Sequence, residues 1–242
     1  MVEVQQQQRA SASGNGFATR VFLQPIAAPS ILGLAGFAGA TFIVASNLAG
    51  WWGTPKSPLA LAPFAAMFGG LAQLLAGMWA YKARDAIATL AHGTWGSFWL
   101  AYLILNILVG SHVVKQPTPW YHNPEVGFWF FALAITTAIA AVAACAESLG
   151  LVAVLSTLAT GSGLVAGAFI YGSLGWAQVG GWVFVFSAGF AWYMVAAMTL
   201  AAAFGRTVLP TFKYRREANL PGLKPVQPIQ LEWAEPGVKM GQ

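Results

Sequence analysis

The sequence predicts an all-α integral membrane protein with six transmembrane helices. Hydrophobic residues make up 57% of the 242 residues, and Asp, Glu, Lys and Arg only 8%, whereas a soluble domain carries about 25% charged residues. Six apolar runs are each long enough to cross a hydrocarbon core of about 30 Å as a helix. None of them contains a charged residue. The six runs are Ser30–Trp51, Leu59–Ala80, Ala86–Gly110, Val126–Ala146, Leu149–Gly172 and Ala177–Gly205.

The first run follows a polar leader. Residues 1–28 contain a run of glutamines and no apolar core of signal-peptide type, so we expect a disordered cytoplasmic leader. Proline fits the first turn of a helix, and a serine caps it well. The unpaired N–H groups at this helix start are a candidate anion site that needs no basic side chain, although most helix starts serve only as caps. The candidate residues are Pro29, Ser30, Leu32, Gly33 and Leu34.

The second and third runs carry the two polar side chains that are hardest to dismiss. The buried amide of Gln73 needs partners for both of its ends, so it either bonds a neighbouring helix or lines a path. His92 lies in the third run. An imidazole titrates near neutral pH and suits a proton-sensitive step, but a neutral histidine bonded to a backbone carbonyl near the helix start is the more common role.

The last three runs follow the longest external loop, and the tail beyond them is rich in proline. The loop, Ser111–Glu125, has three prolines, and residues 206–242 have five. Since proline breaks helices, we expect an extended, basic cytoplasmic tail. The predicted domains are therefore the leader, a transmembrane domain over residues 29–205, and this tail.

The charges predict topology rather than nucleic-acid binding. Ten of the 12 basic residues would lie on the side of both termini, and only Lys56 and Lys115 on the other. Because basic residues favour the cytoplasmic side, we expect both termini in the cytoplasm of a multi-pass plasma-membrane protein. The single cysteine excludes an intrachain disulfide and a cysteine-cluster metal site. The spans also lack the groups of an enzyme site, and we expect no metal and no cofactor.

The uncharged spans limit what the protein can move. A permanently charged, strongly hydrated ion would find only neutral dipoles there, in contrast to the buried charges of many ion-coupled transporters. A small weak acid or a small neutral solute is easier to pass. Composition alone leaves open a carboxylate transporter, a channel for water, ammonia or carbon dioxide, and a non-transporting membrane sensor.

Three motifs in order resemble one known family. Phe68–Gly77 resembles the FGG-x-x-Q-x-x-AG signature of the acetate uptake transporters, also called succinate–acetate permeases. Gly96–Trp99 is similar to their G-[SA]-F-W stretch, and Phe204–Pro210 to their FGRTVLP ending. The hallmark N-P-x-P-L-G-L is kept only in part, with Ala28 in place of Asn and Ile31 in place of the second Pro.

The resemblance implies passage of acetate, and in some members succinate, across the cytoplasmic membrane, with proton symport or channel-like behaviour. It also implies a homo-hexamer in which each six-helix protomer has its own path. Trp95 stands where members often have tyrosine, and Ala191 near a position that affects substrate size. The implied substrate path contains Phe37, Phe68, Gln73, Trp95, Ala191 and Tyr193.

Overall fold

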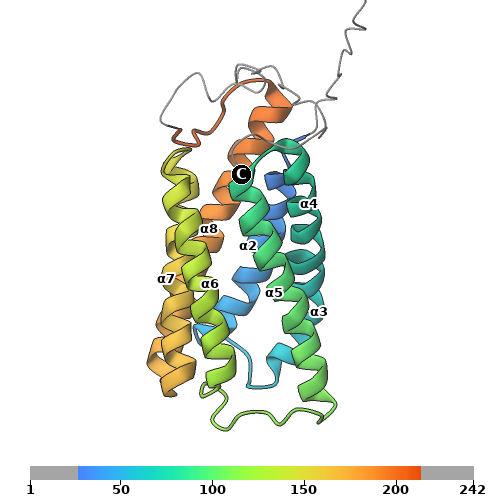
Figure 1. The fold of residues 1–242 in the computed structure, drawn as a ribbon, viewed down its shortest axis with the longest axis vertical. Helices are drawn as coiled ribbons and strands as arrows, with labels where there is room; N and C mark the ends of the chain where they lie inside the picture. Colours follow the sequence, from blue (N-terminus) through green and yellow to red (C-terminus); the bar gives the residue numbers. More distant parts are fainter. Residues whose placement is uncertain (1–26, 214–242) are drawn as a thin grey trace, which may run out of the picture.

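The computed structural model describes residues 27–213, and nearly all of them are helical. Six apolar helices of membrane-spanning length stand side by side in an upright bundle (Figure 1). The expected leader and the tail beyond residue 213 lie outside the described residues. The helices are α2 (Pro29–Leu48), α3 (Ser57–Ala65), η1 (Ala66–Ala72), α4 (Gln73–Ala83), α5 (Ala86–Gly110), α6 (Pro124–Ala144), α7 (Leu149–Tyr171) and α8 (Leu174–Phe204).

The six predicted spans are confirmed, and their ends differ by a few residues. The prediction that Ser30 caps the first helix is wrong, because the N-cap is Ala28, which has no side-chain oxygen, and Ser30 lies inside the first turn. Side-chain oxygens do cap the last four helices, where each accepts a hydrogen bond from the N–H three residues on. These caps are Asp85, Asn123, Ser148 and Ser173.

The second span is one continuous rod with an irregular middle. It runs through α3, η1 and α4, has Pro63 inside α3, and adopts π-helical geometry over Ala66–Ala72. An added Cβ at Gly36 of α2 would overlap the backbone carbonyl of Phe68 in η1. The absent side chain therefore allows α2 to approach the π-turn backbone directly, and π-turns are frequent at functional sites.

The bundle has one loosely packed seam. Helix α7 packs on both α6 and α8, α8 packs on α2, and α5 packs on α4. Contacts of α5 with α6 and with α2 are few. In Figure 1, α6–α8 stand on one side of α2, and α3–α5 on the other. Space for a path therefore lies between α5 and the helices opposite it.

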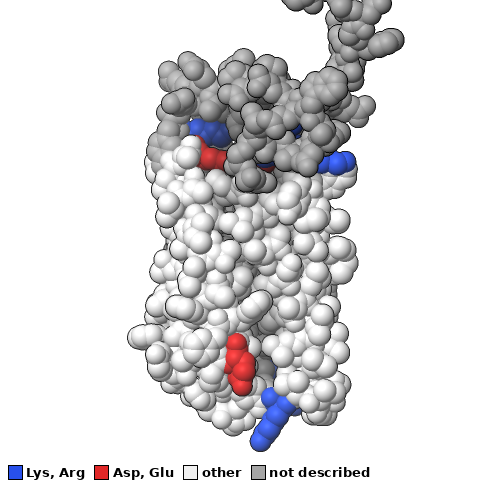
Figure 2. Space-filling model, in the orientation of Figure 1, with Lys and Arg blue, Asp and Glu red and all other residues white. Residues whose placement is uncertain are grey.

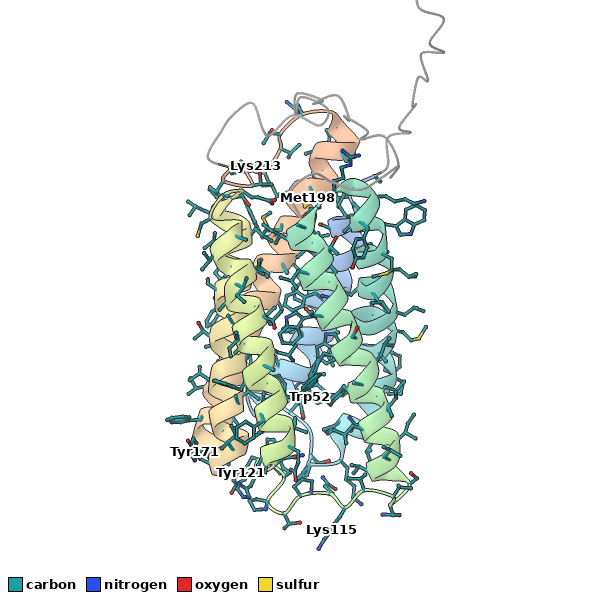
Figure 3. All side chains as sticks on the ribbon, viewed as in Figure 1. Trp52, Lys115, Tyr121, Tyr171, Met198 and Lys213 are labelled. Atoms are coloured by element: carbon teal, nitrogen blue, oxygen red, sulfur yellow. The ribbon has the colours of Figure 1, made fainter. Side chains whose placement is uncertain are left out.

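Charges stand at the two ends of the bundle, and the visible face between them is white in Figure 2. We call the end that holds the start of α2 and the end of α8 the terminal end, and the other the loop end. Figure 3 places Lys213 and Met198 near the terminal end and Lys115 at the loop end. The described basic residues at the terminal end are Lys82, Arg84, Arg206 and Lys213, and those at the loop end are Lys56 and Lys115.

The chain beyond α8 turns back onto the bundle. The hydroxyl of Tyr193 donates a hydrogen bond to the Pro210 carbonyl (2.8 Å), and its ring stacks on Phe212 at 6.1 Å between centroids. The N–H of Leu149 donates to the Phe212 carbonyl (3.1 Å), and Ser148 pairs with Lys213 through an isolated bridge. The described part of the expected extended tail is thus held against α7 and α8.

Candidate functional site: two cavities and an aromatic barrier

Two cavities enter the bundle from its opposite ends. The loop cavity measures about 350 Å³ and the terminal cavity about 770 Å³. The loop cavity is bounded by residues of α2, α3, α5, α6, α7, α8 and the long loop, including Thr41, Trp95, Asn106, Trp120 and Phe184. The terminal cavity is bounded by the starts of α2, α5 and α7, the end of α8 and the returning segment, including Ser30, Asp85, His92, Glu147 and Lys213.

The barrier between the cavities is thin along two helices and thicker along two others. Among the described residues, none lines both cavities. On α5, His92 lines the terminal cavity and Trp95 the loop cavity, and on α7 the same holds for Leu155 and Leu158, so about 5 Å of helix separates the two spaces there. On α2 and α8 the linings lie farther apart, from Leu34 to Thr41 and from Phe184 to Met194.

Aromatic rings fill this barrier. Trp95 has an exposed fraction of 3%, and Phe37 one of 2%. The Trp95 ring meets Phe37 of α2 at 6.5 Å and 69°, Phe98 of α5 at 5.3 Å and 71°, and Phe184 of α8 at 6.5 Å and 82°. Its indole Nε1–H donates a hydrogen bond to the Thr137 hydroxyl of α6 at 3.0 Å. Edge-to-face contacts of this kind favour one fixed arrangement of rings.

Three of the predicted path residues gather here. Ala191 of α8 is fully buried and belongs to the same core cluster as Phe37 and Trp95. Phe68 lies instead on the outer surface, with an exposed fraction of 57%, and lines neither cavity. Tyr193 also lines neither cavity and holds the returning segment through Pro210.

Gln73 and His92 meet between α4 and α5. Both side chains are buried, and the Gln73 Nε2 lies 3.5 Å from the His92 Nδ1. Gln73 lines neither cavity, and its Oε1 has no partner in the described part of the chain. The His92 ring borders the terminal cavity and packs against Gly33, where a Cβ would overlap it. Gln73 therefore reaches the cavity only through the ring that it contacts.

The start of α2 faces the terminal cavity on one side only. Ala28, Ser30 and Leu34 border the cavity, whereas Leu32 has an exposed fraction of 50% on the outside. Pro29 has no N–H and the Ile31 N–H donates to the Ala28 carbonyl at 3.2 Å, so the Ser30 N–H is the first-turn donor that remains at this partly positive helix end. Of the five predicted anion-site residues, Ser30 and Leu34 line this cavity, and Gly33 lies against His92.

Several barrier residues were not singled out from the sequence. Phe184 was one of many aromatic residues, and Thr137 one of many hydroxyls, which usually bond to their own helix. Only a tertiary contact distinguishes them. Within residues 27–213, no three His, Cys, Asp or Glu side chains are placed to hold a metal ion.

Residues 12–214 match the GPR1/FUN34/yaaH family. The chain is 26% identical to the succinate-acetate/proton symporter SatP of Escherichia coli over 76% of this chain and 95% of that protein. It is also 28% identical to ammonia transport outward protein 2 of Saccharomyces cerevisiae, over 68% and 58% of the two chains.

A solved structure has the same architecture. The structure of the bacterial acetate channel SatP superposes with a TM-score of 0.69 at 26% identity, over 77% of this chain and 99% of that one. Six apolar helices and these relatives make the chain a multi-pass plasma-membrane protein. Since the family match extends over most of its length, the protein belongs to the GPR1/FUN34/yaaH family.

Proposed function

We propose that the protein transports acetate and related small carboxylates through the path formed by the two cavities and the aromatic barrier. One observation carries this proposal. Two cavities enter from opposite ends and are separated by neutral side chains, over only one helical turn along α5 and α7. A soluble or interfacial function has no use for such an arrangement, and the likeness to SatP points to acetate as the solute.

The terminal cavity is suited to the carboxylate form of the solute. Two groups supply hydrogen-bond donors there, Ser30 at the start of α2 and His92 of α5. Neither is a lysine or an arginine. A helix N-terminus binds an anion through backbone N–H groups and its positive partial charge. Exchange of bulk water for these donors lowers the cost of bringing the carboxylate to the barrier.

The barrier favours a small solute of low charge. Phe37, Trp95 and Ala191 leave room for a short acyl chain only when the rings move aside, and they offer no charge to an ion. We therefore infer that the proton crosses with the carboxylate, as the neutral acid. Proton symport would then need no titratable carboxyl group in the spans.

The proposed assembly has cytoplasmic termini and six protomers. The ten-to-two distribution of basic residues supports the orientation, and a homo-hexamer is what the family resemblance implies. Protease access to a C-terminal tag in oriented vesicles tests the orientation of the termini. Native mass spectrometry tests the number of protomers. Protection of the tag from protease added on the extracytoplasmic side agrees with the proposal.

Labelled acetate uptake into proteoliposomes tests the function directly. We expect uptake above empty vesicles, stimulation by an inward proton gradient, and competition by propionate and lactate. Ala191→Phe fills the barrier and should reduce uptake to background. The matched control is Thr199→Phe on the exposed face of the same helix, which should retain uptake. Absence of uptake for every short carboxylate would refute the proposal.

Ammonia is the second candidate solute, because one relative is named an ammonia transport outward protein. A neutral molecule smaller than acetic acid can pass an apolar constriction. Alkalinisation of a pH dye inside vesicles after an ammonium pulse measures this flux. An ammonia flux that exceeds the acetate flux and is also abolished by Ala191→Phe would favour this candidate. Vesicles that pass neither solute would favour the sensor hypothesis.

A further inference from the structure

The hydrogen bond between Trp95 and Thr137 joins two helices that otherwise touch little. Trp95 belongs to α5 and Thr137 to α6, and contacts between these helices are few. Within residues 27–213, it is the only side-chain hydrogen bond that the structure shows between α5 and α6. The bond therefore crosses the loosely packed seam of the bundle at the level of the barrier.

Thr137 uses its hydroxyl differently from its neighbour. Thr136 turns its hydroxyl back to the Ala132 carbonyl at 3.0 Å, the usual arrangement for threonine in a helix. The Thr137 side chain is buried and accepts the indole N–H of another helix instead. Because both side chains are buried among apolar residues, a displaced indole would lose this acceptor for its N–H.

The Trp95 indole contacts residues of three other helices at the level of the barrier. Trp95 extends from α5 to Phe37 of α2, to Thr137 of α6 and to Phe184 of α8. Its ring lines the loop cavity, three residues from His92 at the terminal cavity. A rotation of the ring away from these contacts would break the bond to Thr137.

We propose that Thr137 is a positioning residue whose hydroxyl holds the Trp95 indole across the path, and so sets both the closed state and the size limit for solutes. The size limit rests on the proposed carboxylate transport; the closed state does not. A buried hydrogen bond of this kind shifts a two-state ratio by about fivefold. Loss of the hydroxyl should thus increase the population in which the ring has moved aside by about that factor.

Thr137→Val tests the proposal because it keeps the shape of the side chain and removes the acceptor. We expect butyrate uptake relative to acetate uptake to rise about fivefold. The matched control is Thr136→Val, whose hydroxyl serves only its own helix, and its uptake ratio should equal that of the wild type. Thr137→Ser retains the hydroxyl and should restore the wild-type ratio, which separates the hydrogen bond from loss of folding.

A double-mutant cycle shows whether the hydroxyl acts through the indole. Trp95→Phe removes the N–H and keeps an aromatic ring. In that background, Thr137→Val should change the butyrate-to-acetate ratio no further, since the bond is already absent. An equal effect of Thr137→Val in both backgrounds would overturn the proposal. An unchanged ratio for Thr137→Val in the wild-type background would overturn it as well.

Water permeability separates this proposal from the proposed function. Stopped-flow shrinkage of proteoliposomes reports the opening of the barrier whatever the physiological solute is. Thr137→Val should raise water permeability about fivefold over the wild type and over Thr136→Val. Should the wild type transport no carboxylate while Thr137→Val still admits more water, the proposed solute fails and the positioning role stands. Unchanged water permeability counts against the positioning role.

Discussion

The two cavities meet at the same barrier, yet they differ in chemistry. The terminal cavity is bordered by Asp85, His92, Glu147 and Lys213 and by the start of α2. The loop cavity has no charged residue on its described wall and is bordered mainly by aliphatic and aromatic side chains. Polar and charged groups of both signs therefore border the terminal side, while the loop side resembles an apolar funnel. The path is chemically asymmetric although α2, α5, α7 and α8 contribute to both halves.

Trp95→Ala should produce the largest change, because it removes the ring that separates the cavities. We expect acetate flux to rise at least tenfold and larger carboxylates to enter. Without the ring, the path opens without the loss of packing energy, several kcal/mol, that rotation of the ring would require. Uptake of acetate, butyrate and succinate by proteoliposomes measures this. Trp79→Ala, on the exposed surface of α4, is the control. A Trp95→Ala protein that folds but keeps wild-type selectivity would assign the ring a packing role alone.

Gly33→Ala should reduce transport by displacing His92 into the terminal cavity. An added Cβ would overlap the His92 ring, and overpacking of this kind costs about 1–3 kcal/mol. We expect about a tenfold loss of acetate uptake and partial recovery in the Gly33→Ala, His92→Ala double variant, where the clash is absent. Gly39→Ala is the control, since among the described residues its Cβ would meet no atom of another helix within 4 Å. Equal losses for both glycines would remove the link to His92.

Gln73→Ala should lower acetate uptake severalfold. The substitution leaves a space beside His92 and removes the partner of its Nδ1, which costs about 2–5 kcal/mol for a large buried side chain. Thermal unfolding in detergent and uptake should be measured together. His92→Phe keeps a ring in place, and in that background the effect of Gln73→Ala on uptake should shrink. An undiminished effect would show that Gln73 acts independently of the terminal cavity.

Tyr193→Phe should have the smallest effect. It removes one hydrogen bond to the Pro210 carbonyl but keeps the ring that stacks on Phe212, a loss of about 1 kcal/mol. We expect faster hydrogen exchange over residues 207–213 and an acetate flux within about twofold of the wild type. The control is Tyr171→Phe, which lies exposed at the loop end (Figure 3). Unchanged exchange would mean that the stacking alone holds the segment.

Hydrophobicity predicted the spans well, because a membrane helix must satisfy its backbone internally and its length is set by the bilayer. The prediction for α5, Ala86–Gly110, agrees with the structure at both ends. The faces of the second span were harder to place. Five residues turn an ordinary α-helix by about 140° beyond a full turn, so two residues of the same sequence motif can lie on different faces: Phe68 faces outward while Gln73 is buried.

The sequence could not predict which side chains meet across the bundle. Phe37, Trp95 and Ala191 were expected on the path and gather in one cluster. Thr137 carried no local signal, since its neighbour Thr136 has the same chemistry and differs only in the direction it faces. Which hydroxyl meets the indole depends on the rotation of α6 against α5, a property of the packed bundle.

The thin barrier also has an electrical consequence. Where two cavities reach toward each other, the membrane potential falls mainly across the turn that separates them rather than across the full 30 Å of hydrocarbon. A carboxylate anion that crosses this turn moves through most of the field in a single step, worth about 2.3 kcal/mol per 100 mV, while the neutral acid moves through it at no electrical cost. The steepness with which acetate flux depends on voltage therefore reports directly which species crosses the Trp95 ring.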